Sequence, residues 1–214
     1  MNLDQMCENQ EKYLEILSSV ERDGIEELCN YLKTTDFFTA PASTSYHLAE
    51  AGGLCKHSIN VYENMIKLRD IFCPDMPDDT IKVTSLLHDL AKIDFYTTEV
   101  RNKKVYSENG SKSDEMGRFD WVSVPGYRVK ESKDRDLICS EHGVNSYMIA
   151  NRFIQFSAAE ACAIMNHHAG MDNGFVLRDL NEAFNRFPTL TLLHVSDLLS
   201  TYISENPYQI GEDE

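Results

Sequence analysis

The sequence is poor in positive charge and has no long apolar run. It holds 20 lysines and arginines against 35 aspartates and glutamates, which gives a net charge of −15. Surfaces that bind long DNA or RNA are normally basic, because neutralised phosphates supply most of the affinity. No stretch approaches the roughly 18 apolar residues that span a bilayer, and the N-terminus MNLDQMCENQEKY lacks the features of a signal peptide. We therefore expect a cytoplasmic protein whose partners are neither membranes nor long nucleic acids.

The cysteines lack any spacing that indicates a metal or redox motif. None of the six belongs to a C-x-x-C pair, which leaves zinc-ribbon and thioredoxin-like sites without support. The composition is otherwise ordinary. The chain has 214 residues, of which 42% are hydrophobic and 26% charged, and this suits one folded domain or one domain with a modest insertion. A chain of this size can form a core large enough to enclose a buried site.

Apolar residues at helical spacing predict that most of the chain is α-helical. Residues 10–33 indicate two short helices or one helix bent at Gly24, and residues 37–53 indicate a loop. Asp78 or Asp79 is expected to cap a buried helix that runs through LLHDLAK. Further helices are predicted after Gly53 and over EHGVNSYMIANRFI, SAAEACAIMNHH and PTLTLLHVSDLLSTYI, with a capping box at Ser157 and Glu160 and with Pro188 in the first turn of the last helix.

Residues 95–136 break the helical pattern. Glycines and charged residues accompany two alternating fragments, FDWVSV and YRV, and Pro125-Gly126 between them is a plausible turn. The sequence thus predicts an all-α fold with a small β-ribbon insertion at about 95–136. The expected organisation is an N-terminal helical extension over 1–45, a main domain over 46–205 and a flexible polar tail over 206–214.

His88 and Asp89 stand side by side in an apolar predicted helix. Burying an imidazole beside a carboxylate is costly unless something pairs with both groups. A divalent cation would do so, and so would a hydrogen bond between the two. Asp197 repeats the pattern in the last predicted helix. A single histidine is more often structural than a ligand, but further histidines lie on other predicted helices: His57, His142 and the pair His167-His168.

Facing helices of a bundle can direct such side chains into one interior cavity. Mixed imidazole and carboxylate ligands suit a divalent transition metal such as Fe, Mn, Ni, Co or Zn, and the set is large enough for two ions. The seven histidines also include His47, expected either at the mouth of such a site or on the surface, and His194, expected either beside a ligand or simply packed.

The strings GGLCKHSINVYENM and LLHDLAKID, together with Asp197, resemble the signature of the HD-domain superfamily of metal-dependent phosphohydrolases. The resemblance covers residues 46–203, and His142 and His167 match the two-metal branch of that superfamily. Within it, YHLAEAGGLCKHS and NHHAG are most similar to the HD domain of bacterial 3′-to-5′ exoribonucleases, whose separate OB-type domain has no counterpart in this sequence. The resemblance implies an HD-domain helical bundle with the β-ribbon as an insertion.

The resemblance also implies roles for individual residues. Asp89 would bridge two metal ions, one held also by His57, His88 and Asp197, and the other by His142 and His167. The choice between His167 and His168 stays open; His167 is favoured as the ligand, which leaves His168 either to contact the substrate or to serve as a ligand in a variant site. With Asp89 and His168, Lys92 would form the catalytic group, where it either offsets charge on the phosphoryl oxygens or pairs with a carboxylate such as Asp94.

We therefore expect metal-activated water to hydrolyse a phosphomonoester or phosphodiester bond in a small phosphorylated substrate, a nucleotide or a short oligonucleotide. Arg118, Trp121 and Arg128 in the insertion could bind a phosphate and stack on a base, or they could form a solvated surface. Two alternatives stay open: a di-iron oxygenase, because HD-type ligand sets also support oxygen chemistry, and a non-catalytic nucleotide-sensing module. The sequence leaves the oligomeric state open.

Overall fold

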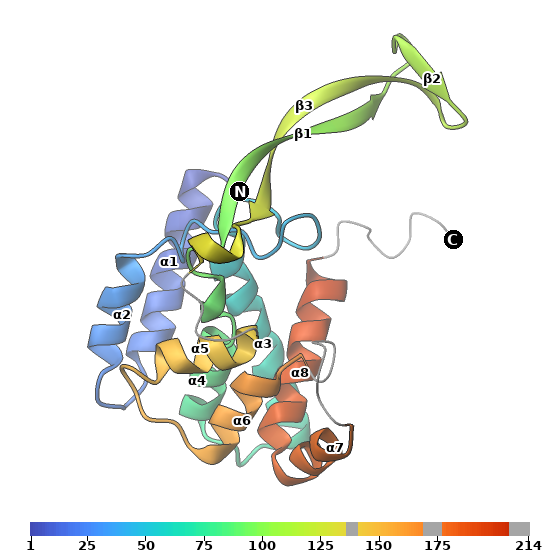
Figure 1. Ribbon diagram of the computed structural model, residues 1–214. Coiled ribbons are helices and arrows are strands. Elements are labelled where there is room, and N and C mark those ends of the chain that lie inside the picture. The colour runs from blue at the N-terminus through green and yellow to red at the C-terminus, as the bar shows by residue number, and fades with distance from the viewer. Residues whose placement is uncertain (136–140, 169–176, 206–214) are drawn as a thin grey trace.

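A computed structural model of the chain describes residues 1–135, 141–168 and 177–205. Helices form a compact body, and a three-stranded antiparallel sheet projects from it as a curved ribbon (Figure 1). The prediction of a mostly helical fold with a small β insertion is therefore confirmed. The predicted tail, the last residue of the predicted insertion, and the Ala-Gly that follows His168 lie outside the described residues.

The N-terminal segment forms two helices, α1 (Leu3–Ser18) and α2 (Ile25–Lys33). Gly24 separates them with a φ of 87°, a left-handed conformation that glycine adopts readily. A side chain at this position would also collide with the backbone of Phe153. Of the two predicted alternatives, two helices is therefore correct. Helix α1 begins before the predicted start because Asn2 and Gln5 form a capping box.

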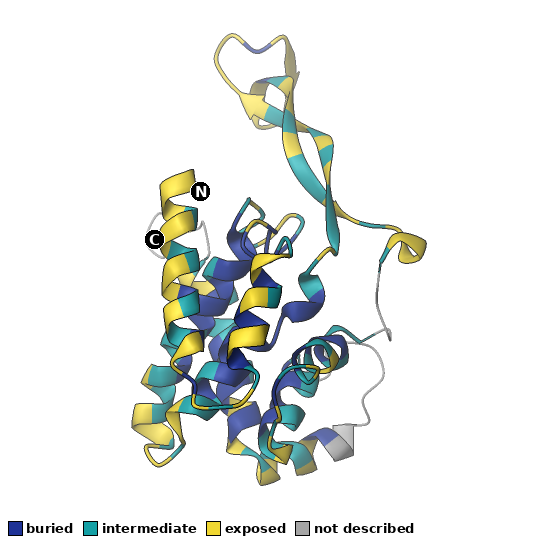
Figure 2. Cartoon of the chain, turned by 90° about the vertical axis from the view of Figure 1, so that its left-hand side faces the viewer, coloured by how far each residue is buried: buried dark blue, intermediate teal, exposed yellow. Residues whose placement is uncertain are grey.

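The centre of the body consists of α3 (Gly53–Phe72) and α4 (Asp78–Leu87). On one side they share a buried apolar cluster with α1 and α2. On the other side they pack against α6 (Ala158–Asn166), α7 (Leu177–Arg186) and α8 (Pro188–Leu199). Figure 2 shows that the buried residues concentrate in this helical body. Because α1 and α2 share a core with the central helices, they are packed parts of the same body.

The prediction of a single helix through LLHDLAK, capped by Asp78 or Asp79, is wrong at both ends of that helix. Asp78 and Asp79 lie inside its first turn, and Pro77 precedes it without a side-chain cap among the described residues. The two carboxylates are engaged elsewhere, because Asp78 pairs with Arg69 and Asp79 accepts the backbone N–H of Glu21. At the other end α4 stops at Leu87, and a 3-10 helix, η1, covers Leu90–Lys92.

His88 and Asp89 thus lie at a helix end and not inside a helix. The backbone of Asp89 leaves the helical region, with φ −111° and ψ 19°, and this turns the chain between α4 and η1. Carbonyl groups in the last turn of a helix lack intrahelical partners. Ser85, in the last turn of α4, uses its carbonyl oxygen to accept a hydrogen bond from the His88 ring at 2.8 Å.

In the C-terminal half, three helices begin where the sequence predicts that they begin. Helix α5 (His142–Ala150) begins at His142, as predicted. The capping box that begins α6 is confirmed, since Ser157 and Glu160 each accept the other's backbone N–H. Pro188 occupies the first turn of α8, as expected. Helix α8 continues into a short π-helix, η3 (Ser200–Ser204).

The ribbon consists of β1 (Tyr96–Tyr106), β2 (Lys112–Asp114) and β3 (Gly117–Val129), followed by a 3-10 helix, η2 (Ser132–Asp134). The sheet order is β1-β3-β2. The predicted turn at Pro125-Gly126 is wrong, because both residues are paired within β3, opposite Val100 and Glu99. Strand β2 covers only the distal part of β3, so Pro125 lies where β3 has an open edge, a place that tolerates proline.

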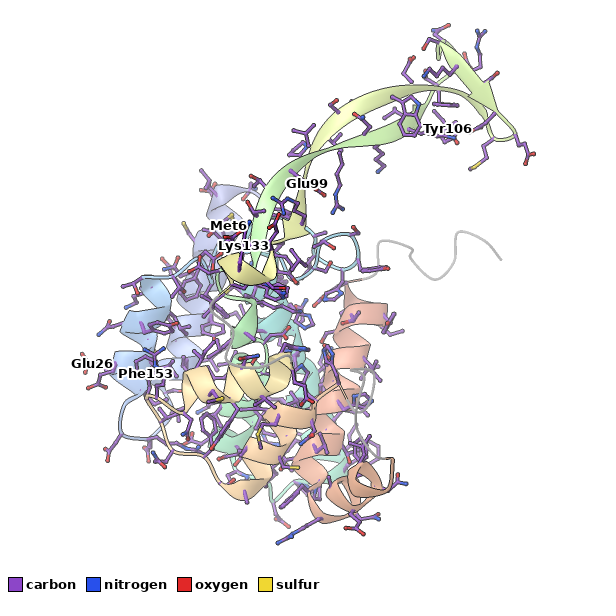
Figure 3. All side chains as sticks on the ribbon, in the orientation of Figure 1. Met6, Glu26, Glu99, Tyr106, Lys133 and Phe153 are labelled. Atoms are coloured by element: carbon purple, nitrogen blue, oxygen red, sulfur yellow. The ribbon has the colours of Figure 1, made fainter. Side chains whose placement is uncertain are left out.

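The ribbon contacts the helical body near its base. Glu99 lies close to this base and Tyr106 lies far out along the ribbon (Figure 3). Within the described parts of the chain, no helix combines the length and apolar character that crossing a membrane requires.

Candidate metal centre

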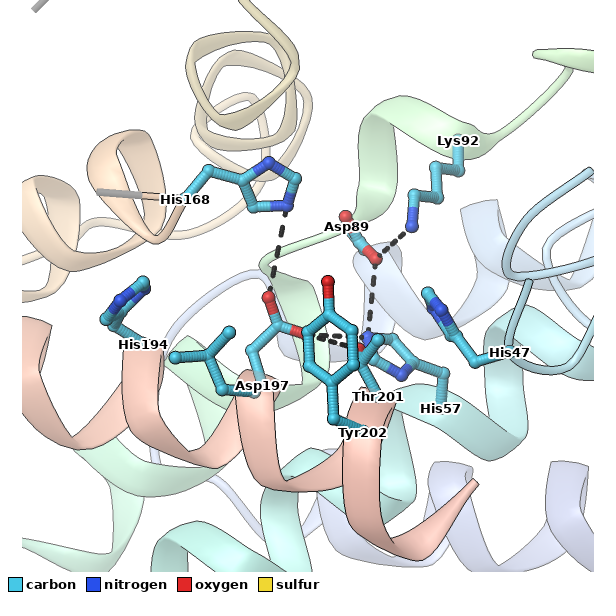
Figure 4. Close-up of a pocket in the computed structure, with 10 residues that line it drawn as sticks. His47, His57, Asp89, Lys92, His168, His194, Asp197, Thr201 and Tyr202 are labelled. Carbon is cyan, nitrogen blue, oxygen red and sulfur yellow. Dashed lines mark hydrogen bonds and ion pairs between the residues drawn. The ribbon is translucent and has the colours of Figure 1, made fainter. Parts of the chain in front are cut away.

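The residues predicted as metal ligands come from separate elements and meet at one point in the helical body. Helix α3 carries His57 in its buried first half, and α8 carries Asp197. The other predicted ligands lie at helix ends. The gathered residues are His57, His88, Asp89, His142, His167 and Asp197. Figure 4 shows part of this cluster around the carboxylate of Asp89.

The two carboxylate oxygens of Asp89 face different histidines. Oδ2 lies 3.4 Å from Nε2 of His88 and 3.7 Å from Nε2 of His57. Oδ1 lies 3.3 Å from Nε2 of His142 and 3.8 Å from Nε2 of His167. Asp197 extends the first group, because its Oδ1 is 3.2 Å from Nε2 of His57. Asp89 therefore lies between two sets of potential ligands.

Hydrogen bonds to Nδ1 determine which ring nitrogen faces inward. Nδ1 of His88 and of His167 lie 2.8 and 2.7 Å from the carbonyl oxygens of Ser85 and Ile164. A carbonyl oxygen can only accept a hydrogen bond, so Nδ1 carries the hydrogen in both rings. The Nε2 lone pairs are thereby directed at Asp89, as metal-ligating histidines require.

Two buried polar atoms of the cluster have no hydrogen-bond partner among the described residues: Nε2 of His88 and Oδ1 of Asp89. Leaving such groups unpaired in the interior is costly. Divalent cations held beside Asp89 would satisfy these atoms, and the potential ligand atoms in each of several three-residue groups lie within 4.8 Å of one another. The residues present therefore fit a site for a divalent transition metal.

The cluster strongly perturbs the protonation of its own members. Burial alone would lower the pKa of His57, but Glu205 and Asp197 outweigh this and raise it to about 10. Burial disfavours the charged form of Asp89, yet Lys92 and His88 hold its pKa well below the ordinary value. Burial and His142 lower the pKa of His167, which keeps that ring neutral. Without metal, an imidazolium at position 57 thus neutralises part of the carboxylate charge.

Lys92 belongs to the same cluster and forms a salt bridge, which was one of its two predicted roles. Its ammonium nitrogen lies 2.7 Å from Oδ2 of Asp89, so the partner is this carboxylate and not Asp94. Burial opposes the charge of Lys92, but Asp89 raises its pKa above the ordinary value. Lys92 also lines an adjoining cavity of about 150 Å³. The walls comprise His47, His57, Asp89, Lys92, His168, His194, Asp197, Leu198, Thr201 and Tyr202 (Figure 4).

The other histidines take distinct places around this cavity. His168 has 31% of its side chain exposed, and its Nε2 lies 3.9 Å from Oδ2 of Asp197. His194 donates from Nδ1 to the backbone oxygen of His167 at 2.6 Å, so it supports a predicted ligand. The His47 ring lies 4.9 Å from the His57 ring, at the cavity and not on the open surface. Burial lowers the pKa of His47 to about 4.

Glu205 is a buried part of the site that sequence reasoning missed. Both of its carboxylate oxygens lie 3.1 Å from Nδ1 of His57, and Asn60 donates to Oε1 at 2.8 Å. Glu205 begins the polar string ENPYQIGEDE, which suggested a frayed terminus. A usable signal was present, since Asp197, Thr201 and Glu205 recur at intervals of four residues, as on one face of a helix.

The structure does not bring the three substrate-binding candidates of the insertion to the cavity. Arg118 lies in the distal part of β3, where its Nε donates to the carbonyl oxygen of Gly110 at 3.0 Å. Trp121 packs against Phe119, with ring centroids 5.8 Å apart. Arg128 lies near the base of the ribbon, and the described residues that line the cavity do not include it. Substrate binding by these residues stays a prediction.

No family model matches the chain, and neither a curated protein nor a solved structure matches it significantly. The fold and the cluster together describe a mostly helical protein with a buried histidine and aspartate centre suited to metal.

Proposed function

We propose that the protein is a metal-dependent phosphohydrolase of the HD type. It would hydrolyse a phosphomonoester or phosphodiester bond in a small phosphorylated substrate, such as a nucleotide or a short oligonucleotide. The observation that carries this proposal is the position of Asp89, whose two oxygens face two separate sets of histidines. A carboxylate in this position suits a bridge between two cations, an arrangement typical of enzymes that displace groups at phosphorus.

In this proposal, Asp89 is shared by both sets of ligands. One ion would bind His57, His88, Asp89 and Asp197, and the other would bind Asp89, His142 and His167. These nitrogen and oxygen ligands suit Fe, Mn, Ni, Co or Zn. When bound, such ions lower the pKa of water toward neutrality, so that it can attack phosphorus, and they offset charge on the phosphoryl oxygens.

The chain's own residues would bind and orient the substrate. Lys92 places a positive charge on the cavity wall, 2.7 Å from Asp89, where it would hold that carboxylate and attract a phosphoryl oxygen. His168 lines the same cavity and would donate a hydrogen bond to the substrate. Because the cavity is only about 150 Å³, it would hold a phosphoryl group while the rest of the substrate lies at the mouth, near His47 and Tyr202.

Metal analysis and a phosphatase and phosphodiesterase screen across nucleotides test the proposal. We expect bound transition metal and release of phosphate or a nucleotide from at least one compound. The variant Asp89→Asn should lose metal and lower turnover by more than the roughly 10- to 100-fold typical of an outer partner. The matched control is Asp94→Asn, the same change at a mostly exposed side chain five positions away, and it should behave as wild type. Full activity and metal content in Asp89→Asn would contradict the proposal.

A di-iron oxygenase is the second candidate, because the same buried imidazole and carboxylate set also suits two iron ions. Bound iron with a mixed-valence spectrum and substrate-dependent oxygen uptake would favour it. Phosphate release under anaerobic conditions would exclude it in favour of hydrolysis. A nucleotide-sensing module without catalysis would instead purify without metal and bind nucleotide without turnover. The cytoplasmic location and the absence of membrane and long nucleic-acid partners also stay predictions from the sequence.

A further inference from the structure

We propose that Glu205 is a positioning residue that orients the imidazole of His57 for metal binding, and that the π-helix η3 holds it in place. This inference rests on the proposed metal centre. Glu205 lies one residue beyond η3, on the continuation of the helix that carries Asp197. Its side chain is only 1% exposed, although carboxylates are rarely buried to this degree unless they are paired.

The carboxylate of Glu205 hydrogen-bonds to one face of α3. Its two oxygens lie 3.1 Å from Nδ1 of His57. Asn60, nearly one turn further along α3, donates to Oε1 at 2.8 Å. A charged carboxylate can only accept, so Nδ1 of His57 carries a hydrogen and Nε2 faces Asp89 and Asp197.

The position of His57 explains why a side chain is needed for this role. His88 and His167 each follow the end of a helix, and their Nδ1 atoms use backbone oxygens three residues earlier. Such oxygens are free of intrahelical partners only in the last turn. His57 lies in the first half of the 20-residue helix α3, where backbone oxygens accept the helix's own hydrogen bonds. An outside acceptor is therefore required, and Glu205 supplies it.

The π-helix accounts for how one helix contacts both sides of the same ring. Asp197 approaches Nε2 of His57 at 3.2 Å, whereas Glu205 approaches Nδ1. The backbone N–H of Glu205 donates to the oxygen of Ser200 at 2.9 Å, a five-residue interval that widens the turn and rotates Glu205 relative to a regular helix. The hydroxyl of Ser200 accepts a hydrogen bond from Asn64 at 2.9 Å, which ties η3 to α3.

A carboxylate on Nδ1 makes the metal-facing nitrogen more basic and fixes the ring plane. Removal of such partners typically costs about 10- to 100-fold in metal affinity without removing a ligand. We therefore expect Glu205→Ala to weaken binding of the ion that His57 holds by about this factor. Glu205→Gln, which keeps an acceptor oxygen but no charge, should weaken it less. Asn60→Ala should have a small effect that disappears in the Glu205→Ala background.

The experiment titrates metal-free full-length protein with Co²⁺, and both calorimetry and the electronic spectrum are recorded. Wild type, the three single variants, the double variant Glu205→Ala/Asn60→Ala and a control are compared. The control is Glu63→Gln, which changes a partly exposed carboxylate on α3 that pairs with Lys12. Stoichiometry at saturation should be equal in all of them. In protein loaded with diamagnetic Zn²⁺, NMR should show a hydrogen on Nδ1 of His57 that exchanges slowly with water in wild type and faster in Glu205→Ala.

Two outcomes would overturn the inference. Wild-type affinity in Glu205→Ala would show that the carboxylate does not act on His57. Loss of one equivalent of metal at saturation in both Glu205 variants would make Glu205 a direct ligand, with His47 and His57 as its partners in a separate site. None of these readouts requires turnover. A protein that binds Co²⁺ as expected but hydrolyses no phosphate ester would therefore contradict the proposed function and leave this inference intact. A wild type that binds no metal would refute both.

Discussion

His167 and His168 are adjacent in the sequence but differ in their surroundings. His167 is buried, its Nδ1 is held by a backbone oxygen, and its Nε2 lies 3.8 Å from Asp89 and 3.1 Å from Nε2 of His142. His168 has 31% of its side chain exposed and faces the cavity beside Asp197. This geometry is compatible with His167 as a ligand and with His168 either as a group that contacts substrate or as a further ligand, because the ligand atoms of His142, His167 and His168 lie within 4.8 Å of one another.

The two histidines should therefore respond differently to the same substitution. His168→Ala should keep the wild-type metal content and lower turnover by roughly 10- to 100-fold, because a hydrogen bond to a charged group contributes about 1.5–3 kcal/mol. His167→Ala should lose one equivalent of metal, because it removes a nitrogen that faces Asp89. Elemental analysis and steady-state kinetics on both variants provide the test, and each variant is the control for the other. The opposite pattern would exchange their roles.

His57 makes the metal-free protein sensitive to pH. Its pKa of about 10 in the folded protein lies above its ordinary value of 6.5, so the protonated ring contributes stability that is complete below pH 6.5 and is lost as pH rises through 10. Metal must displace this proton. We therefore expect the Tm of metal-free protein to fall between pH 7 and 10, while apparent metal affinity rises by up to about tenfold per pH unit for each proton displaced. Calorimetry in buffers of different ionisation enthalpy counts the released protons. Metal binding without proton release would contradict this expectation.

At the level of single residues, the sequence was informative wherever a polar group stands in an apolar surrounding. His88, Asp89 and Asp197 stand out in this way, and the structure brings them together with the other proposed ligands. Glu205 was not recognised, because its neighbours in the sequence are polar and its partner His57 lies 148 positions away. A contact over such a distance depends on the packing of α8 against α3, which no local pattern encodes.

Among the elements, helix ends were predictable where the chain itself supplies the cap. Ser157 and Glu160 mark the start of α6, and Pro188 marks the start of α8. The prediction was wrong where tertiary contacts decide the end. Asp78 is used by Arg69 instead of capping α4, and Pro125-Gly126 is held straight by pairing with β1. In each case the local preference for a cap or a turn was weaker than contacts with another element.

Glu160 joins three elements through a buried ion pair as well as capping α6. Its carboxylate accepts hydrogen bonds from the backbone N–H of Ser157, from the hydroxyl of Thr80 on α4 and from Arg22. Nη2 of Arg22 lies 2.6 Å from Oε1 of Glu160. Glu160 is 1% exposed, so removal of its cationic partner would leave a buried charge. Arg22→Ala should lower the free energy of unfolding by about 3 kcal/mol.

Urea denaturation at pH 7 measures this effect. The matched control is Lys12→Ala, which removes the cation of the exposed Lys12–Glu63 pair and should cost at most about 1 kcal/mol. Arg22 and the backbone of Ser157 lower the pKa of Glu160 below its ordinary 4.5 against the effect of burial. The pair therefore stabilises the protein above pH 4.5, and the deficit of Arg22→Ala should shrink as pH falls below that value. Equal losses in the two variants would show that Glu160 tolerates the loss of Arg22.

The whole molecule divides its charge unevenly between the helical body and the ribbon. Residues 96–129 contain six basic and five acidic side chains and so carry a net charge of +1, whereas the rest of the chain carries −16, which gives the total of −15. Alternation and the break in the helical pattern were enough to predict a ribbon in this region, although the turn predicted at Pro125-Gly126 was wrong, but they did not predict its direction. That direction depends on contacts at its base, where the Tyr96 hydroxyl donates to Ala42 at 3.3 Å and Arg101 donates to Thr44 at 2.8 Å.

In the described part of the chain the ribbon contacts the body at its base, so the body should fold without it. Thr97 and Arg128 are paired across β1 and β3, so an Asn-Gly turn can replace residues 98–127 while this pair is kept. We expect the shortened protein to unfold cooperatively and to bind as much metal as wild type, since the cavity and the cluster are built from the helical body. Its kcat on a minimal phosphate ester should be unchanged.

If Arg118 and Trp121 bind substrate as the sequence predicts, KM for the preferred nucleotide should rise in the shortened protein. Arg118→Ala and Trp121→Ala in the full chain should reproduce part of that rise. Loss of metal or of cooperative unfolding would show instead that the ribbon is required to form the helical body and its metal centre.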